Sequence, residues 1–73
     1  MIFRHYKTKK LYEYIGEARH SETLEYMAIY KSMETGELWA RPKVMFFGMV
    51  DAPNIDGGPQ QVRRFEEVKS NEL

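Results

Sequence analysis

Apolar and polar residues alternate along two long segments of the chain, 11–20 and 24–33. In LYEYIGEARH, a period of two gives one face made of Tyr12, Tyr14, Gly16, Ala18 and His20. In LEYMAIYKSM, it gives one face made of Leu24, Tyr26, Ala28, Tyr30 and Ser32. A period of two is typical of strands. Leu, Glu, Met and Ala in the second segment also favour helix, but turn signals on both sides indicate a strand.

Those turn signals are HSET at 20–23 and ETGE at 34–37. Ser and Thr hydroxyls bond to nearby backbone groups in turns, so we expect Ser21 and Thr23 to do so while Glu22 faces solvent. Gly36 stands where a type I turn with a G1 bulge needs a left-handed residue. The pattern therefore predicts two consecutive hairpins.

Shorter elements complete the predicted fold. Residues 3–7 form an opening strand, LWARP at 38–42 forms a third strand ended by a proline, and VRRFEEV at 62–68 forms the last strand. Residues 43–47 predict one helical turn that ends at Gly48. We expect Met45, Phe46 or Phe47 of this turn to plug one end of the barrel. Residues 51–61 are a loop by composition. The sequence predicts an all-β barrel or roll of about five strands with one short helical turn.

Length and composition indicate one small domain over residues 1–73, with frayed ends at 1–2 and 69–73. We find no internal repeats. The chain has no cysteine, which excludes disulfides and thiolate–metal sites and fits a reducing cytoplasm. No apolar run is long enough for a signal peptide or a membrane span. We therefore expect a soluble, cytoplasmic protein without a membrane partner.

Charge is balanced over the whole chain, with 11 Lys and Arg against 11 Asp and Glu. A dedicated duplex-DNA binder would be strongly basic. Residues 1–10 nevertheless contain four Lys and Arg residues and no acid, so a local basic patch is expected.

The segment ARHSETLE at 18–25 contains residues that could be catalytic, with Ser21 as nucleophile and His20 as base. Neighbours on a strand point to opposite faces, and no glycine-flanked elbow surrounds the serine. The segment therefore indicates a turn. A small hydrolase that uses His20 and Glu22 is the third hypothesis. It ranks last because a chain this short cannot enclose a pocket of ~300 Å³ unless it dimerises.

No metal or other cofactor is predicted. His5 and His20 could act as ligands with Glu13, Glu17 or Glu25, but the spacing matches no metal motif, and a site needs three or four converging ligands. We expect His20 to pack and to bond to backbone. The loop DAPNIDGG lacks the ligand spacing of an EF-hand.

Four segments, RHYK (4–7), YEYIGEARHSETLEYMAIYK (12–31), LWARPKVMFF (38–47) and RRFEEV (63–68), resemble a small bacterial domain family of unknown function. The resemblance covers nearly the whole chain and implies an SH3-like barrel with no established activity. The chain departs from the family pattern in two places. Thr8-Lys9-Lys10 replaces a glycine-containing turn, and the 51–61 loop is longer.

The leading functional hypothesis is a non-enzymatic binding module. An arginine fork binds carboxylate or phosphate, and aromatic rings supply a stacking surface beside it. The ligand would be a small anion, a nucleic acid or a peptide. The candidate binding residues are Arg19, His20, Trp39 and Arg41, followed by Arg4, His5, Tyr30 and Arg64.

Two alternatives stay open. The arginines could instead form surface ion pairs with Glu13, Glu17, Glu22 or Glu25. The domain could also be a homo-oligomer or an accessory subunit that docks a protein partner through a strand edge or an apolar patch. Met27, Ile29 and Met33 motivate that reading, because they lie opposite the tyrosine face of segment 24–33.

Overall fold

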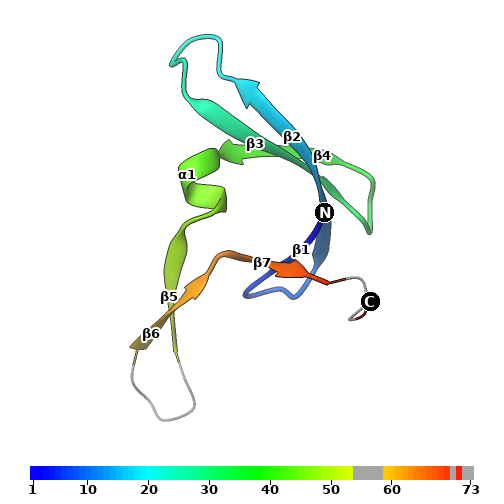
Figure 1. The fold of residues 1–73 in the computed structure, drawn as a ribbon, viewed down its shortest axis with the longest axis vertical. Coiled ribbons are helices and arrows are strands. Elements are labelled where there is room, and N and C mark those ends of the chain that lie inside the picture. The colour runs from blue at the N-terminus through cyan, green and yellow to red at the C-terminus, as the bar shows by residue number, and fades with distance from the viewer. Residues whose placement is uncertain (54–58, 70, 72–73) are drawn as a thin grey trace.

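The computed structural model describes residues 1–53, 59–69 and 71. Seven strands and one short helix follow each other along the chain (Figure 1). They are β1 (Ile2–His5), β2 (Leu11–Arg19), β3 (Tyr26–Ser32), β4 (Leu38–Pro42), α1 (Lys43–Phe46), β5 (Met49–Pro53), β6 (Pro59–Arg63) and β7 (Phe65–Val68). The predicted all-β class with a single helical turn is confirmed.

Five of the strands form one antiparallel sheet in the order β4-β3-β2-β1-β7. The strands from β1 to β4 are joined as successive hairpins, and β7 returns to pair with β1. Figure 1 shows this sheet curving round a concave side. Within the described residues its two edge strands, β4 and β7, do not pair with each other, so the curved sheet remains open.

The hydrophobic core lies on the concave side of the sheet and is mainly aromatic. Its buried members come from β1, β3, α1 and β7: Phe3, Ala28, Tyr30, Phe46 and Phe65. Phe46 is fully buried and its ring stacks on that of Phe65 with 4.2 Å between centroids. Of the three residues expected to plug the fold, Phe46 therefore enters the core, while Met45 and Phe47 stay partly exposed.

The prediction of which side chains share one face of the first long strand is wrong from Ile15 onward. The register of β2 against β3 shifts between Tyr14 and Gly16, so Ile15 has no partner and is 53% exposed. A bulge of one residue exchanges the two faces of a strand. Tyr12 and Tyr14 pack against the core, but Gly16, Ala18 and His20 do not continue their face.

The three hairpins from β1 to β4 close with the same six-residue turn: HYKTKK at 5–10, HSETLE at 20–25 and SMETGE at 32–37. The side chain of the first residue accepts hydrogen bonds from the backbone N–H groups of the third and fourth. The fourth residue is threonine, and its Oγ1 accepts from the N–H of the sixth. The fifth has a left-handed backbone, with φ of 65° at Lys9, 65° at Leu24 and 79° at Gly36.

This geometry confirms the predicted turns and corrects one detail. Thr23 and the left-handed Gly36 act as expected. His20, rather than Ser21, provides the acceptor at the start of the second turn, through Nδ1 at 3.1 Å from the N–H nitrogen of Glu22. The first turn has no glycine, yet Lys9 adopts the same left-handed backbone.

The prediction of a loop over residues 51–61 is wrong for its described parts. β5 and β6 pair from Met49 with Arg63 to Pro53 with Pro59, and they extend from the sheet as an arm (Figure 1). The loop was expected because this segment contains two prolines and two glycines. The two paired prolines stand at the last rung of the ladder, where a missing N–H costs least. Residues 54–58 of the expected loop lie outside the described residues.

The prediction of one strand over 62–68 is also wrong, because the chain changes sheets at Arg64. Its N–H donates to the carbonyl of Gly48, and its own carbonyl accepts from the N–H of Tyr6. Arg64 thus separates β6 in the arm from β7 in the main sheet.

The molecule is more extended than a compact chain of its length. Its radius of gyration is 13.6 Å, against about 11 Å expected for a compact domain of this size. No helix in the described residues has the length and apolar character needed to cross a membrane.

Candidate ligand-binding pocket

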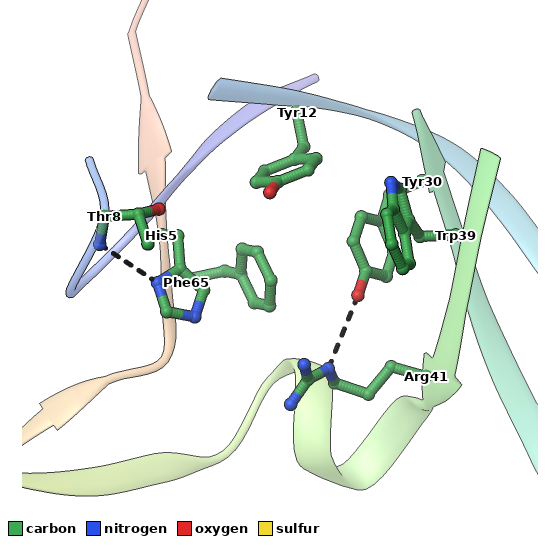
Figure 2. Close-up of a pocket in the computed structure, with 7 residues that line it drawn as sticks. All are labelled: His5, Thr8, Tyr12, Tyr30, Trp39, Arg41 and Phe65. Atoms are coloured by element: carbon green, nitrogen blue, oxygen red, sulfur yellow. Dashed lines mark hydrogen bonds between the residues drawn. The ribbon is translucent and has the colours of Figure 1, made fainter. Parts of the chain in front are cut away.

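A pocket of about 160 Å³ opens on the concave side of the sheet, and four of the eight predicted site residues line it. Figure 2 shows the seven lining side chains around a common space. Those predicted from sequence are His5, Tyr30, Trp39 and Arg41, and the others are Thr8, Tyr12 and Phe65.

Strand register explains why these side chains meet. In β3 and β4, Tyr30 lies opposite Trp39 and Ala28 lies opposite Arg41. Directly opposed residues share a face of the sheet, and Ala28 is fully buried in the core. Trp39 and Arg41 therefore stand on the concave side. At the other edge, His5 of β1 lies opposite Phe65 of β7.

Arg41 supplies the fixed positive charge of the pocket. Its Nε donates a long hydrogen bond of 3.4 Å to the Tyr30 hydroxyl, and its guanidinium carbon lies 5.9 Å from the centre of the Phe65 ring. In Figure 2 the two terminal nitrogens of Arg41 lie on the side of the guanidinium that faces Phe65 and His5. That end of the fork can bind an anion with two parallel hydrogen bonds.

His5 supplies a neutral donor. Its Nδ1 accepts from the backbone N–H of Lys7 at 3.1 Å and of Thr8 at 3.4 Å, so the ring proton belongs on Nε2. Burial lowers the pKa of His5 below its ordinary value, and the positive charges of Arg41, Arg64 and Lys7 lower it further. The neutral imidazole therefore offers one N–H to the pocket.

Aromatic rings form the rest of the wall. Tyr12, Tyr30 and Phe65 contact one another edge to face, with centroids 5.3 to 5.7 Å apart. Trp39 is different, because it is 49% exposed at the edge strand. Its exposed ring borders the pocket.

No acidic side chain lines this pocket. Two other pockets in the described part of the chain both include glutamate. One, of about 380 Å³, has Glu66 and Glu67 beside Phe3 and Phe47. The other, of about 250 Å³, has Glu66 beside Tyr6 and Lys9. Only the pocket at Arg41, among these three, combines a cation with a wall free of carboxylates.

The other four predicted site residues lie elsewhere. Arg19 stacks over Tyr26 at 4.3 Å near the far end of β2, and His20 is part of the second turn. Arg4 alternates with the inward-facing Phe3 and His5 along β1. Arg64 donates from Nε to the carbonyl of Met45 at 3.2 Å. Its positive charge contributes to the lowered pKa of His5.

Three lining residues, Thr8, Tyr12 and Phe65, are not among the site residues predicted from the sequence. Tyr12 was placed on the correct face of its strand but was not assigned to a site. Phe65 could have been found, since it is the one large aromatic residue in VRRFEEV. Its position opposite His5 depends on β7 returning to β1, which no local pattern indicates.

The alternative of arginine ion pairs finds no support in the described residues. All ion pairs there involve lysine: Lys10 with Glu34 at 3.7 Å, Lys69 with Glu67 at 3.6 Å, and Lys43 with Glu17. None joins an arginine to Glu13, Glu17, Glu22 or Glu25. The part of the chain that the structure describes also holds no group of three or more His, Asp or Glu side chains placed to bind a metal ion.

Fold and pocket together define a small all-β domain with a donor-lined, aromatic pocket on the concave side of its sheet. A family model covers most of this chain. Residues 1–67 match the model of the family described as "Protein of unknown function (DUF1653)", and the chain belongs to that family. No curated protein and no solved structure matches the chain.

Proposed function

We propose that this domain is a non-enzymatic binding module that takes a small anionic ligand in the pocket at Arg41. The carrying observation is the convergence of Arg41 and His5 donors on a wall without any carboxylate. A buried or half-buried cation without an acidic partner is costly, and an incoming anion would offset that cost. Charge-assisted hydrogen bonds to Arg would supply much of the affinity.

Two further observations support this assignment. Burial is the main cause of the lowered pKa of His5, but the positive charges of Arg41, Arg64 and Lys7 also lower it, in a molecule of zero net charge. The family resemblance implies an SH3-like fold, and by analogy such folds bind ligands on one face. Here the pocket lies on the concave face of the sheet.

Catalysis by His20 is a weaker reading. The Nδ1 atom of His20 accepts two backbone hydrogen bonds within its turn, so it cannot take a proton from Ser21 through that nitrogen. Glu22 is exposed in the same turn. The turn itself accounts for both residues.

The test is an amide NMR titration at low salt with sodium acetate, inorganic phosphate, ATP and a short mixed-sequence RNA in turn. We expect saturable shifts at His5, Tyr30, Trp39 and Arg41 with at least one anion, and loss of these shifts when salt is raised. Arg41→Gln should abolish them. Arg19→Gln removes the same charge at the far end of β2 and serves as the control.

Either of two results would overturn this function. One is silence with every anion, and the other is binding that Arg41→Gln leaves intact. The amide spectrum of each variant shows whether it is folded, so loss of binding can be separated from loss of structure.

A second candidate function is self-association. The segment from α1 into β5 exposes apolar side chains on both sides of the buried Phe46, with Val44 81%, Met45 45% and Met49 51% exposed. Such a patch is typical of a protein interface. We expect sedimentation velocity to show dimers at high concentration and Val44→Glu to abolish them. A strict monomer at every concentration would exclude this candidate without affecting the pocket.

A further inference from the structure

The pocket geometry also indicates which anion it takes, an inference that rests on the proposed function. We propose that the ligand is a monocarboxylate attached to a single flat ring. The carboxylate binds end-on to the terminal nitrogens of Arg41 with His5 Nε2–H as a third donor. The ring lies between Trp39 and the wall formed by Tyr30 and Phe65.

Charge favours a monoanion. Among the lining residues only Arg41 carries a full positive charge, because His5 uses Nδ1 as an acceptor for the first turn. Protonating that nitrogen would break two backbone hydrogen bonds. The nearby Arg64 binds the carbonyl of Met45 with its Nε. One fixed cation matches a carboxylate, whereas a phosphomonoester carries about −1.5 to −2 at neutral pH.

The directions of the donors favour a planar anion. Arg41 uses its Nε for the Tyr30 hydroxyl, so the fork is turned with its terminal pair toward the open space in Figure 2. Two parallel N–H groups match the two oxygens of a carboxylate. Figure 2 shows the ring of His5 across the same space, beyond the edge of Phe65.

Size and wall chemistry favour one ring. The volume of about 160 Å³ is close to the ~150 Å³ apolar cavity that holds a benzene molecule. The Phe65, Tyr30 and Tyr12 rings already satisfy one another by edge-to-face contacts. The exposed Trp39 ring is therefore the surface on which a ligand ring gains most.

The same features disfavour nucleic acid. Strong binding to a phosphate backbone uses several cations along a groove, and this pocket presents one. The pocket also has no carboxylate to accept from the amino groups of bases. A ring with a single carboxylate matches the donors of Arg41 and His5, and both oxygens of that carboxylate find a donor.

The test compares four small molecules by amide NMR titration: benzoate, acetate, benzamide and phenyl phosphate. Acetate lacks the ring, benzamide lacks the charge, and phenyl phosphate replaces the monoanion with a dianion. We expect benzoate to bind about ten- to a hundredfold tighter than acetate or benzamide. We expect phenyl phosphate to bind no tighter than benzoate.

Two variants assign the parts of the ligand. Trp39→Leu should weaken benzoate by about tenfold while leaving acetate unchanged, because only the ring contact is lost. Arg41→Gln should reduce benzoate to the level of benzamide. Arg4→Gln, which removes a charge from the opposite face of β1, is the matched control and should bind benzoate as the wild type does.

The outcomes separate this inference from the proposed function. Tighter binding of phenyl phosphate, or equal binding of acetate and benzoate, would overturn the ring-carboxylate ligand and leave an anion-binding pocket. Failure of every anion to bind would overturn both. A peptide ending in phenylalanine, tested with a free and with an amidated C-terminus, shows whether the pocket accepts the end of a polypeptide chain. Binding of the free form alone supports a C-terminal carboxylate as the natural ligand. Binding of neither form supports a free aromatic acid.

Discussion

His5 has two roles within one imidazole ring. Its Nδ1 holds the turn between β1 and β2, while the ring lines the pocket and meets the edge of Phe65 at 5.1 Å. The turn thereby fixes both the tautomer and the orientation of the ring.

At this scale we predict a pH-dependent loss of stability. The pKa of His5 lies below its ordinary value of 6.5 in the folded protein, so the unfolded chain binds a proton that the folded chain does not. The free energy of unfolding should therefore fall as pH drops from 6.5 through the lowered pKa. Urea unfolding between pH 7.5 and 5.5 measures this slope.

The matched variant for that experiment is His5→Asn, since an Asn side chain can also accept the turn hydrogen bonds but does not titrate. Its slope over the same pH range should be shallower than that of the wild type. Identical slopes would show that His5 does not couple folding to protons.

One turn geometry closes three consecutive hairpins although its sequences differ. HYKTKK, HSETLE and SMETGE share an acceptor side chain at the first position, threonine at the fourth and a left-handed backbone at the fifth. Glycine occupies the fifth position once, while lysine and leucine take it elsewhere. For these two residues the left-handed backbone costs about 1–2 kcal/mol.

Two substitutions of opposite sign test this account. Leu24→Gly should stabilise the domain by about 0.5–1 kcal/mol, because Leu24 is 59% exposed and loses little burial. Gly36→Ala should destabilise it by about 1 kcal/mol, since a new Cβ meets nothing within 4 Å and only backbone strain remains. Thermal unfolding of both variants gives the comparison, and the same sign for both would contradict it.

The sequence pattern was sufficient for elements that depend on neighbours in the chain. It located β2, β3, β4 and the helical turn, because strand periodicity and turn residues act locally. It failed at the Ile15 bulge and at Arg64, where pairing with distant strands decides the backbone. For the same reason only part of the pocket was predicted. Trp39 and Arg41 lie on the same face of one strand, which local alternation indicates, but Phe65 reaches His5 only through the return of β7.

At the scale of the molecule, one aromatic side chain joins most of the structure. The Phe46 ring of α1 lies within 5.3 Å of the ring centres of Phe3, Tyr30 and Phe65. These rings belong to β1, β3 and β7. A chain of 73 residues has little other core to replace them.

We predict that Phe46→Ala costs about 3–5 kcal/mol, which is comparable to the whole stability of a small domain. The variant should show a collapsed amide spectrum at room temperature. Met49→Ala, at a 51% exposed site in β5, should change stability by less than about 0.5 kcal/mol. A folded Phe46→Ala spectrum would mean that another part of the molecule carries the stability.

The position of Phe65 has a consequence for the order of events during synthesis. The hairpins from β1 to β4 contain only local pairings, which form quickly, and they leave the ribosome before β7 does. Six of the seven lining residues can therefore be present while Phe65 is still missing. Because β7 pairs only with β1 among the described strands, the nascent domain completes this pocket only with its last strand, and a ligand of the kind proposed would in turn hold that strand in place.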